Sequence, residues 1–141
     1  MESSYRSTRR AVYNLTVHMV FVTKYRTSVF DVNMLNRLEE VFKSVCESWD
    51  SELIEFHGEK DHVHLLVSFP PHKLLSSLIA NLKATASKTM WREFENIMRG
   101  KFWSKKVLWT GSYFVASCGG VTIETLKKYV KNQERPDPSQ R

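Results

Sequence analysis

The sequence predicts an α+β fold in which helices cover one face of an antiparallel sheet, and three patterns lead to this class. Short segments with alternating apolar and polar residues indicate strands, whereas two long segments with apolar residues at helical spacing indicate helices. These segments follow one another in the order strand, helix, strand, strand, helix, strand. This is the order of the split βαβ, ferredoxin-like class. One more helix follows the last strand and is an addition to that plan.

The first expected strand and helix occupy residues 13–49. The segment YNLTVHMVFVT, residues 13–23, is rich in β-branched and aromatic residues, so we expect a long strand there. Asp31 is a suitable helix cap, and the apolar stripe from Leu35 to Val45 predicts a helix that reaches about Trp49. This helix is expected to pack on the sheet.

The rest of the chain completes the predicted order. Polar residues 59–61 suit a hairpin turn between two short strands. A second helical segment, another strand and the additional helix follow. The expected ranges are strands at about 53–58 and 62–69, a helix at 74–98, a strand at 113–116 and a final helix at 122–133.

Composition bounds the class of protein. The 141 residues are 42% hydrophobic, which is enough for one compact domain over residues 1–141, with its core at about 13–133 and a polar tail at 134–141. Cys46 and Cys118 lie far apart, which argues against a disulfide framework or a zinc ribbon. Without a signal peptide or a membrane-spanning run, we expect a cytoplasmic protein with no membrane partner. The net charge of +6 is compatible with a polyanionic partner but does not identify one.

The segment DHVHLLV, residues 61–67, is the first chemically informative motif. On a strand, His62 and His64 point to the same face, with their Cβ atoms about 7 Å apart, and can share one metal ion. The intervening Val63 and its alternating neighbours point into the expected core. The alternative is a pair of ordinary surface histidines, since two ligands do not complete a metal site.

The final helix holds the second candidate group. Tyr129 and Gln133 are four residues apart, so they lie one turn above each other. Together they would present a hydroxyl nucleophile and a neutral oxygen ligand on one face. The alternative is a tyrosine at the boundary of the core, with its ring packed and its hydroxyl in water.

These motifs resemble the single-tyrosine HUH transposases of small prokaryotic insertion sequences that move as single-stranded DNA. The HUH motif corresponds to His62-Val63-His64. The resemblance also covers HMVFVTKYR (18–26), SYFVASCGG (112–120) and ETLKKYVKNQ (124–133), in the same order along the chain. It extends over nearly all of residues 13–133.

The resemblance implies a chemistry and its residues. His62, His64 and Gln133 would bind a divalent metal, magnesium or manganese, and Tyr129 would be the nucleophile that forms a 5′-phosphotyrosine with single-stranded DNA. Such a protein would recognise hairpins at the ends of the element. The resemblance also implies a homodimer with active sites shared between subunits, in which the tyrosine helix of one subunit meets the histidines of the other. The sequence itself does not distinguish this arrangement from one within a single subunit.

Basic residues supply candidate contacts with DNA phosphates, although each could equally be a solvated charge. They fall at the end of the first strand, near the N-terminus, among aromatic residues after position 100, and around Tyr129. The candidates are Lys24, Arg26, Arg9, Arg10, Lys105, Lys106, Lys127 and Lys131.

Other functions stay open at this point. A domesticated relative that acts on chromosomal repeats would use the same chemistry. A non-catalytic ferredoxin-like nucleic-acid-binding domain would explain charge and fold, but not the histidine and tyrosine motifs. A zinc hydrolase or deaminase lacks the H-E-x-x-H or P-C-x-x-C pattern, and Cys118 has no evident base partner.

Overall fold

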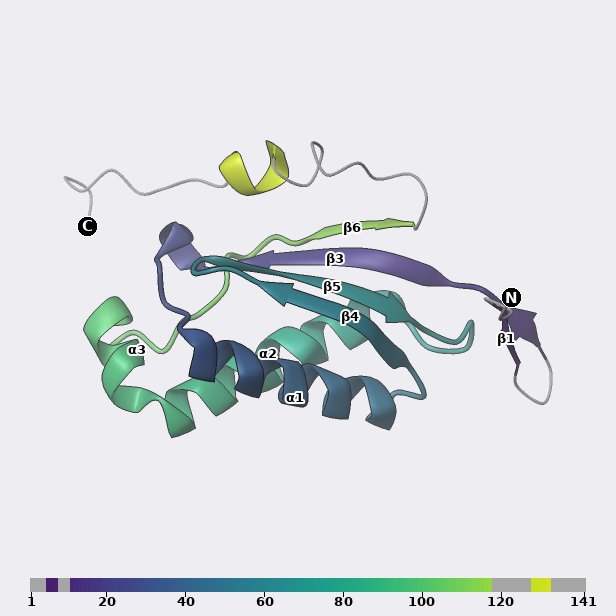
Figure 1. The fold of residues 1–141 in the computed structure, drawn as a ribbon, viewed down its shortest axis with the longest axis horizontal. Coiled ribbons are helices and arrows are strands. Elements are labelled where there is room, and N and C mark those ends of the chain that lie inside the picture. Colours follow the sequence, from purple (N-terminus) through teal and green to yellow (C-terminus); the bar gives the residue numbers. More distant parts are fainter. Residues whose placement is uncertain (1–4, 8–10, 118–127, 133–141) are drawn as a thin grey trace.

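A four-stranded antiparallel sheet forms the centre of the molecule (Figure 1), which is a computed structural model that describes residues 5–7, 11–117 and 128–132. The strands are β3 (Thr16–Val22), β4 (Glu52–Gly58), β5 (His62–Ser68) and β6 (Phe114–Ser117). Their order across the sheet is β4-β5-β3-β6, and each neighbouring pair is antiparallel. The predicted α+β class with an antiparallel sheet is therefore confirmed.

The helices lie on one side of this sheet, as Figure 1 shows. They are α1 (Val32–Ser48), α2 (Leu75–Glu93) and α3 (Glu95–Phe102), with a short 3₁₀ turn, η1 (Lys24–Arg26), after β3. Asp31 caps α1 as expected, because its carboxylate accepts a 2.8 Å hydrogen bond from the backbone N–H of Met34. The cap satisfies one of the backbone donors that a helix leaves free at its start.

The hydrophobic core fills the space between the sheet and the helices. Val63, Leu65 and Val67 of β5 are fully buried there, as their alternation with the histidines predicts. Phe21 of β3 meets Phe42 of α1 edge to face, with ring centroids 6.0 Å apart. One face of each central strand is thus committed to packing.

The prediction of one continuous helix over residues 74–98 is wrong in one respect, because the helix is interrupted at Phe94. This residue has non-helical backbone angles (φ −126°, ψ 38°) and separates α2 from α3. The break redirects the chain so that Met98 and Phe102 of α3 return to the core. Apolar spacing continues across the break, so periodicity alone did not indicate it.

The first strand is also shorter than expected. Val12 and Tyr13 form β2 (Val12–Tyr13), which pairs with β1 (Arg6–Ser7) in a separate two-stranded sheet. Leu15 lies between β2 and β3 and is 37% exposed, so the predicted apolar alternation does not extend through it.

The final helix expected over residues 122–133 falls mostly outside the described residues. Within the described part, residues 128–131 are helical. No helix in the described ranges combines the length and apolar character that crossing a bilayer requires.

Candidate active site on the open face of the sheet

His62 and His64 lie side by side on the sheet face that points away from α1 and α2. Their ring centroids are 4.9 Å apart and the rings are nearly perpendicular, at 82°. In the register of the sheet, His64 lies between Val20 of β3 and His57 of β4. The strand geometry therefore brings together the two imidazoles that the sequence singled out.

A carboxylate fixes one of these rings. Asp61, at the end of the turn between β4 and β5, has Oδ1 2.8 Å from Nδ1 of His62. Its other oxygen, Oδ2, lies 3.5 Å from Nε of Arg26 in η1. Asp61 was not among the predicted site residues, although its position directly before His62 in the sequence was a signal for it.

The second ring is neutral at pH 7. Burial, followed by the nearby charges of His62, His57 and His18, lowers the pKa of His64 from 6.5 to about 4. A neutral imidazole keeps a lone pair and is the form that ligates metals.

The donor set fits part of a divalent metal site. Two imidazoles on one strand face, one of them hydrogen-bonded through its other nitrogen, are typical of metal-binding histidines. Among the described residues, no group of three or more His, Cys, Asp and Glu side chains is placed to hold a metal ion. The predicted third ligand, Gln133, lies outside the described residues.

The helical turn 128–131 covers the same face of the sheet, on the side opposite α1 and α2 (Figure 1). Val130 is 7% exposed and clusters with Val20 and Val22 of β3, both fully buried. This contact explains why the second half of β3 is buried on both faces. Because Val22 and Val20 pair with His62 and His64, the turn lies one strand away from the histidines.

Tyr129 is held at the edge of this small cluster. Its ring centroid is 5.3 Å from that of Phe114 on β6. Its hydroxyl oxygen is 3.3 Å from Oγ of Ser112. The ring is therefore packed, as in the boundary interpretation, while the hydroxyl makes a polar contact on the face that carries the histidines.

A partly buried lysine organises the segment before β6, and the sequence analysis did not predict it. Nζ of Lys83 on α2 donates to the backbone carbonyls of Thr110, at 2.9 Å, and Ser112, at 3.3 Å. Burial lowers the pKa of this ammonium. Lys83 thus connects α2 to the residue whose side chain contacts Tyr129.

The predicted DNA-binding residues are placed in different surroundings. Lys24 lies over the ring of Tyr25, with Nζ 5.6 Å from the centroid. Arg26 faces Asp61 and its side chain is 19% exposed. Lys105, Lys106 and Lys131 are exposed, whereas Arg9, Arg10 and Lys127 lie outside the described residues.

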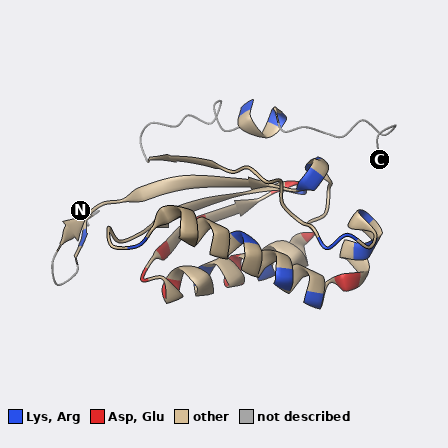
Figure 2. Cartoon of the chain, turned by 180° about the vertical axis from the view of Figure 1, so that it is seen from behind, with Lys and Arg blue, Asp and Glu red and all other residues tan. Residues whose placement is uncertain are grey.

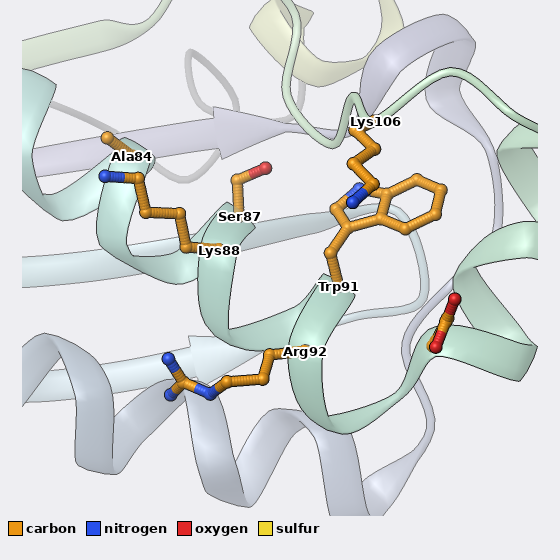
Figure 3. A pocket seen from close by; sticks show the side chains of 7 residues that line it. Ala84, Ser87, Lys88, Trp91, Arg92 and Lys106 are labelled. Atoms are coloured by element: carbon orange, nitrogen blue, oxygen red, sulfur yellow. The ribbon is translucent and has the colours of Figure 1, made fainter.

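Lys106 lines a cleft on the helical side of the molecule (Figure 3). The cleft has a volume of about 690 Å³. Its aromatic residue, Trp91, is only 9% exposed and donates through Nε1 to the carbonyl of Val107 at 2.9 Å. Basic residues occur along α2, α3 and the segment that follows (Figure 2). The cleft residues are Ala84, Ser87, Lys88, Trp91, Arg92, Glu95 and Lys106.

Comparison with known proteins places this combination of fold and motifs among the transposases. The family model of IS200-like transposases matches residues 11–133, and the chain belongs to this family. The resemblance drawn from the sequence motifs is confirmed, and with it the assignment to transposition of an insertion sequence.

Individual relatives agree with this assignment. The chain is 26% identical to the ISDra2 transposase TnpA of Deinococcus radiodurans over 125 residues, which cover 89% of this chain and 88% of that protein. It is 28% identical to the transposase for insertion sequence element IS200 of Salmonella typhimurium over 126 residues, covering 89% and 80% of the two chains.

Solved structures support the fold. A crystal structure described as a transposase of Deinococcus radiodurans R1 superposes with a TM-score of 0.83 at 25% identity, covering 93% of this chain and 99% of that one. A REP-associated tyrosine transposase, solved bound to a REP hairpin, gives a TM-score of 0.56 at 13% identity, with coverage of 89% and 67%. At that identity the second comparison shows a shared fold alone.

Proposed function

We propose that this IS200-like transposase cleaves and rejoins single-stranded DNA by transesterification, with Tyr129 as the nucleophile. The observation that carries the proposal is the common face of the sheet: His62 and His64 lie on β5, and the turn with Tyr129 packs on the adjacent strand β3. These polar groups therefore share the sheet face that the core does not use, with β3 between the histidines of β5 and the ring of Tyr129 on Phe114 of β6.

The proposed reaction exchanges one phosphodiester bond for another. The hydroxyl of Tyr129 gives up its proton and its oxygen attacks the phosphorus. The bond from phosphorus to the 3′ oxygen breaks, and that oxygen leaves as a 3′-hydroxyl with a proton. The products are a 5′-phosphotyrosine and a free 3′ end. A 3′-hydroxyl then attacks the phosphotyrosine to rejoin strands, so the cycle needs no external energy source.

His62, His64 and Gln133 are the proposed ligands of a magnesium or manganese ion. When bound, such an ion supplies positive charge that stabilises the transition state of the phosphate. Ser112, whose Oγ is 3.3 Å from the hydroxyl oxygen of Tyr129, would hold that hydroxyl in place for the attack.

The substrate we propose is single-stranded DNA with hairpins, bound partly through basic residues. Lys88, Arg92 and Lys106 line the cleft beside α2 together with Glu95 and small side chains, and the ring of Trp91 there is only 9% exposed. The three cations are candidate phosphate contacts, whereas the buried ring offers little surface for stacking bases. Lys24, Lys105 and Lys131, together with Arg9, Arg10 and Lys127, are further candidates.

Two features of the architecture belong to the same proposal. Residues 1–141 would form one ferredoxin-like domain, which the strand order β4-β5-β3-β6 supports. We also propose a homodimer with shared active sites. The sequence Gly119-Gly120 between β6 and the tyrosine turn supports this, since glycines permit the change of backbone direction that an exchange between subunits needs.

A domesticated nuclease that acts on chromosomal repeats is the second candidate function. The same histidine and tyrosine motifs would serve such a nuclease, and a REP-associated tyrosine transposase solved with a REP hairpin shares the fold. The chemistry would be the same, so the two candidates differ in the hairpin sequence that is cut.

The decisive experiment is a covalent adduct assay with the full chain, a single-stranded hairpin oligonucleotide and Mg²⁺ or Mn²⁺. We expect a protein–DNA band that survives denaturing electrophoresis and disappears with EDTA. Tyr129→Phe should form no adduct, while the control Tyr113→Phe, on a partly exposed tyrosine before β6, should form it normally. If Tyr129→Phe formed the adduct at the parental rate, the assignment of Tyr129 as the nucleophile would be refuted. Binding without any adduct, across candidate hairpins, would support a non-catalytic domain.

A further inference from the structure

The surroundings of His62 are built from two segments that are far apart in the sequence. Asp61 lies between His62 and Arg26, with contacts of 2.8 Å to the imidazole and 3.5 Å to the guanidinium. The side chains of Asp61 and His62 are each 15% exposed, and that of Arg26 is 19% exposed. This is a largely enclosed row of guanidinium, carboxylate and imidazole.

The carboxylate determines which imidazole nitrogen is free. An ionised aspartate can only accept a hydrogen bond, so Nδ1 of neutral His62 must carry the proton at the 2.8 Å contact. The lone pair of the ring is then on Nε2. A hydrogen-bonded carboxylate of this kind fixes both the tautomer and the orientation of a metal-binding histidine.

Arg26 reaches the carboxylate because the backbone of η1 takes an uncommon shape. Tyr25 and Arg26 have positive φ values of 64° and 54°, which residues other than glycine rarely adopt. Backbone strain of this kind tends to occur at functional sites. Nε of Arg26 is buried and makes no hydrogen bond to any residue that the structure describes, and its polar contact within that part of the chain is the ion pair with Asp61.

Buried Thr23 connects the two segments directly. Its backbone N–H donates to the carbonyl of Asp61 at 2.9 Å, and its hydroxyl oxygen is 3.1 Å from the same carbonyl. The hydroxyl is also 2.7 Å from the carbonyl of Thr27 at the far end of η1. The position of Arg26 is therefore coupled to that of Asp61 through the backbone.

We propose that Asp61 and Arg26 are positioning residues for His62, which hold its ring with Nδ1 protonated and Nε2 directed to the metal. This inference rests on the proposed function, because it takes His62 as a metal ligand. It also gives Arg26 a different task from the DNA contact that the sequence suggested.

The first test reads the tautomer in the metal-free protein. Long-range ¹H–¹⁵N spectra of the histidine rings at pH 8, where an ordinary histidine is neutral, should show His62 protonated at Nδ1. Asp61→Asn should move the proton to Nε2, because an asparagine amide can donate to Nδ1. A wild-type ring protonated at Nε2 would overturn the proposal without any variant.

The second test measures Mn²⁺ affinity without DNA, by titration calorimetry. Asp61→Asn should weaken binding roughly 10- to 100-fold, and Arg26→Gln should weaken it less, because the Asp61–His62 contact remains. Glu55→Gln is the matched control: Glu55 also lies near a histidine, 3.9 Å from His57, but on an exposed part of β4. Its affinity should equal that of the wild type.

A His62→Ala variant distinguishes a failure of the proposed metal site from a failure of the proposed positioning role of Asp61. If this variant binds Mn²⁺ like the wild type, the metal site of the proposed function is wrong. If it loses Mn²⁺ while folded Asp61→Asn stays within twofold of the wild type, only the positioning role is wrong. Should Asp61→Asn fail to fold, the wild-type tautomer and Arg26→Gln still decide the outcome.

Discussion

The two faces of strand β5 differ in composition and in surroundings. On the face toward the helices, Val63, Leu65 and Val67 are fully buried in the core. On the opposite face, His62 and His64 are half-buried, with a carboxylate beside one ring and a small apolar cluster on the neighbouring strand. Successive residues thus serve stability and chemistry in turn, because a strand points its side chains alternately to its two faces.

The comparison teaches that the two histidines are mounted on a strand whose other face is anchored in the core. Ligand geometry is held best when it is built on regular elements instead of loops. Substitutions on the two faces should therefore separate cleanly, with loss of activity on one face and loss of folding on the other. His64→Ala and Leu65→Ala test this separation directly, and two further variants test the helical side of the molecule, which is away from β5.

The largest effect is expected from His64→Ala on the open face. Removing a proposed metal ligand should lower the rate of adduct formation by at least about 10³-fold, which corresponds to about 4 kcal/mol in activation free energy. The melting temperature should change by no more than about 4 °C, since the ring is not part of the core. His57→Ala, on the exposed neighbour of His64, is the control and should keep its activity. A cooperative loss of fold in His64→Ala would contradict the separation.

The next effect is expected from Leu65→Ala, one residue further along β5. Truncating a fully buried leucine should destabilise the protein by about 2–5 kcal/mol, from lost burial and from the cavity that remains. Chemical unfolding monitored by circular dichroism measures this. The folded fraction should still form adduct at the normal rate under stabilising conditions. A stable Leu65→Ala protein without activity would show that the core face also has a direct part in catalysis.

A smaller effect is expected on the helical side of the molecule, where Lys106 lines the cleft. If Lys106 contacts a phosphate, Lys106→Gln should reduce the slope of log K against log salt by about 0.7–0.9. Fluorescence anisotropy with a labelled hairpin at several salt concentrations measures it. Lys43→Gln, on the exposed side of α1, should leave the slope unchanged. Equal slopes for Lys106→Gln and the wild type would remove this lysine from the DNA surface.

The smallest effect is expected from the surface pair Arg37–Glu93, which joins α1 to α2 by contacts of 2.8 and 3.0 Å. The hydrogen bond from Arg37 lowers the pKa of Glu93 from its ordinary 4.5. A lowered folded-state pKa stabilises the fold above the unfolded value, and that contribution is lost as pH falls through the folded value. Arg37→Gln should lower the melting temperature at pH 7 by only about 1 °C.

The pH dependence of that pair distinguishes it from packing effects. The difference between Arg37→Gln and the wild type should shrink as the pH falls from the ordinary carboxyl pKa of 4.5 through the lower folded-state pKa of Glu93. Arg99→Gln, which affects a pair within α3 only, is the comparison. A difference that persists at low pH would assign the effect to packing of the arginine stem.

Local patterns predicted much of this molecule. Alternation placed Val63 and His64 on opposite faces, and the apolar stripe with its Asp31 cap located α1. The break at Phe94 was not predictable from periodicity, because the apolar spacing runs on from α2 into α3. The separate pairing of β1 with β2 was not predicted, because the β-rich segment 13–23 gives no sign that the chain leaves the main sheet between β2 and β3.

The site was predictable in part for a similar reason. The histidine pair is a local pattern on one strand. The contact of Asp61 with Arg26 joins residues 35 positions apart and depends on the positive φ values in η1, which no spacing rule indicates. The cleft at Lys106 likewise requires α2 and the segment after α3 to meet. Contacts between distant segments are set by the tertiary fold, so they had to come from the structure.

The alternation along β5 also has a consequence for how this protein changes over generations. A substitution on the core-facing side of β5 is expected to change the stability of the fold, and one on the opposite side its chemistry. Variants of these two kinds can therefore be selected independently. Inserting or deleting one residue is different, because it exchanges the faces of every residue beyond it. Lineages of this transposase are therefore expected to vary β5 by substitution while keeping its length.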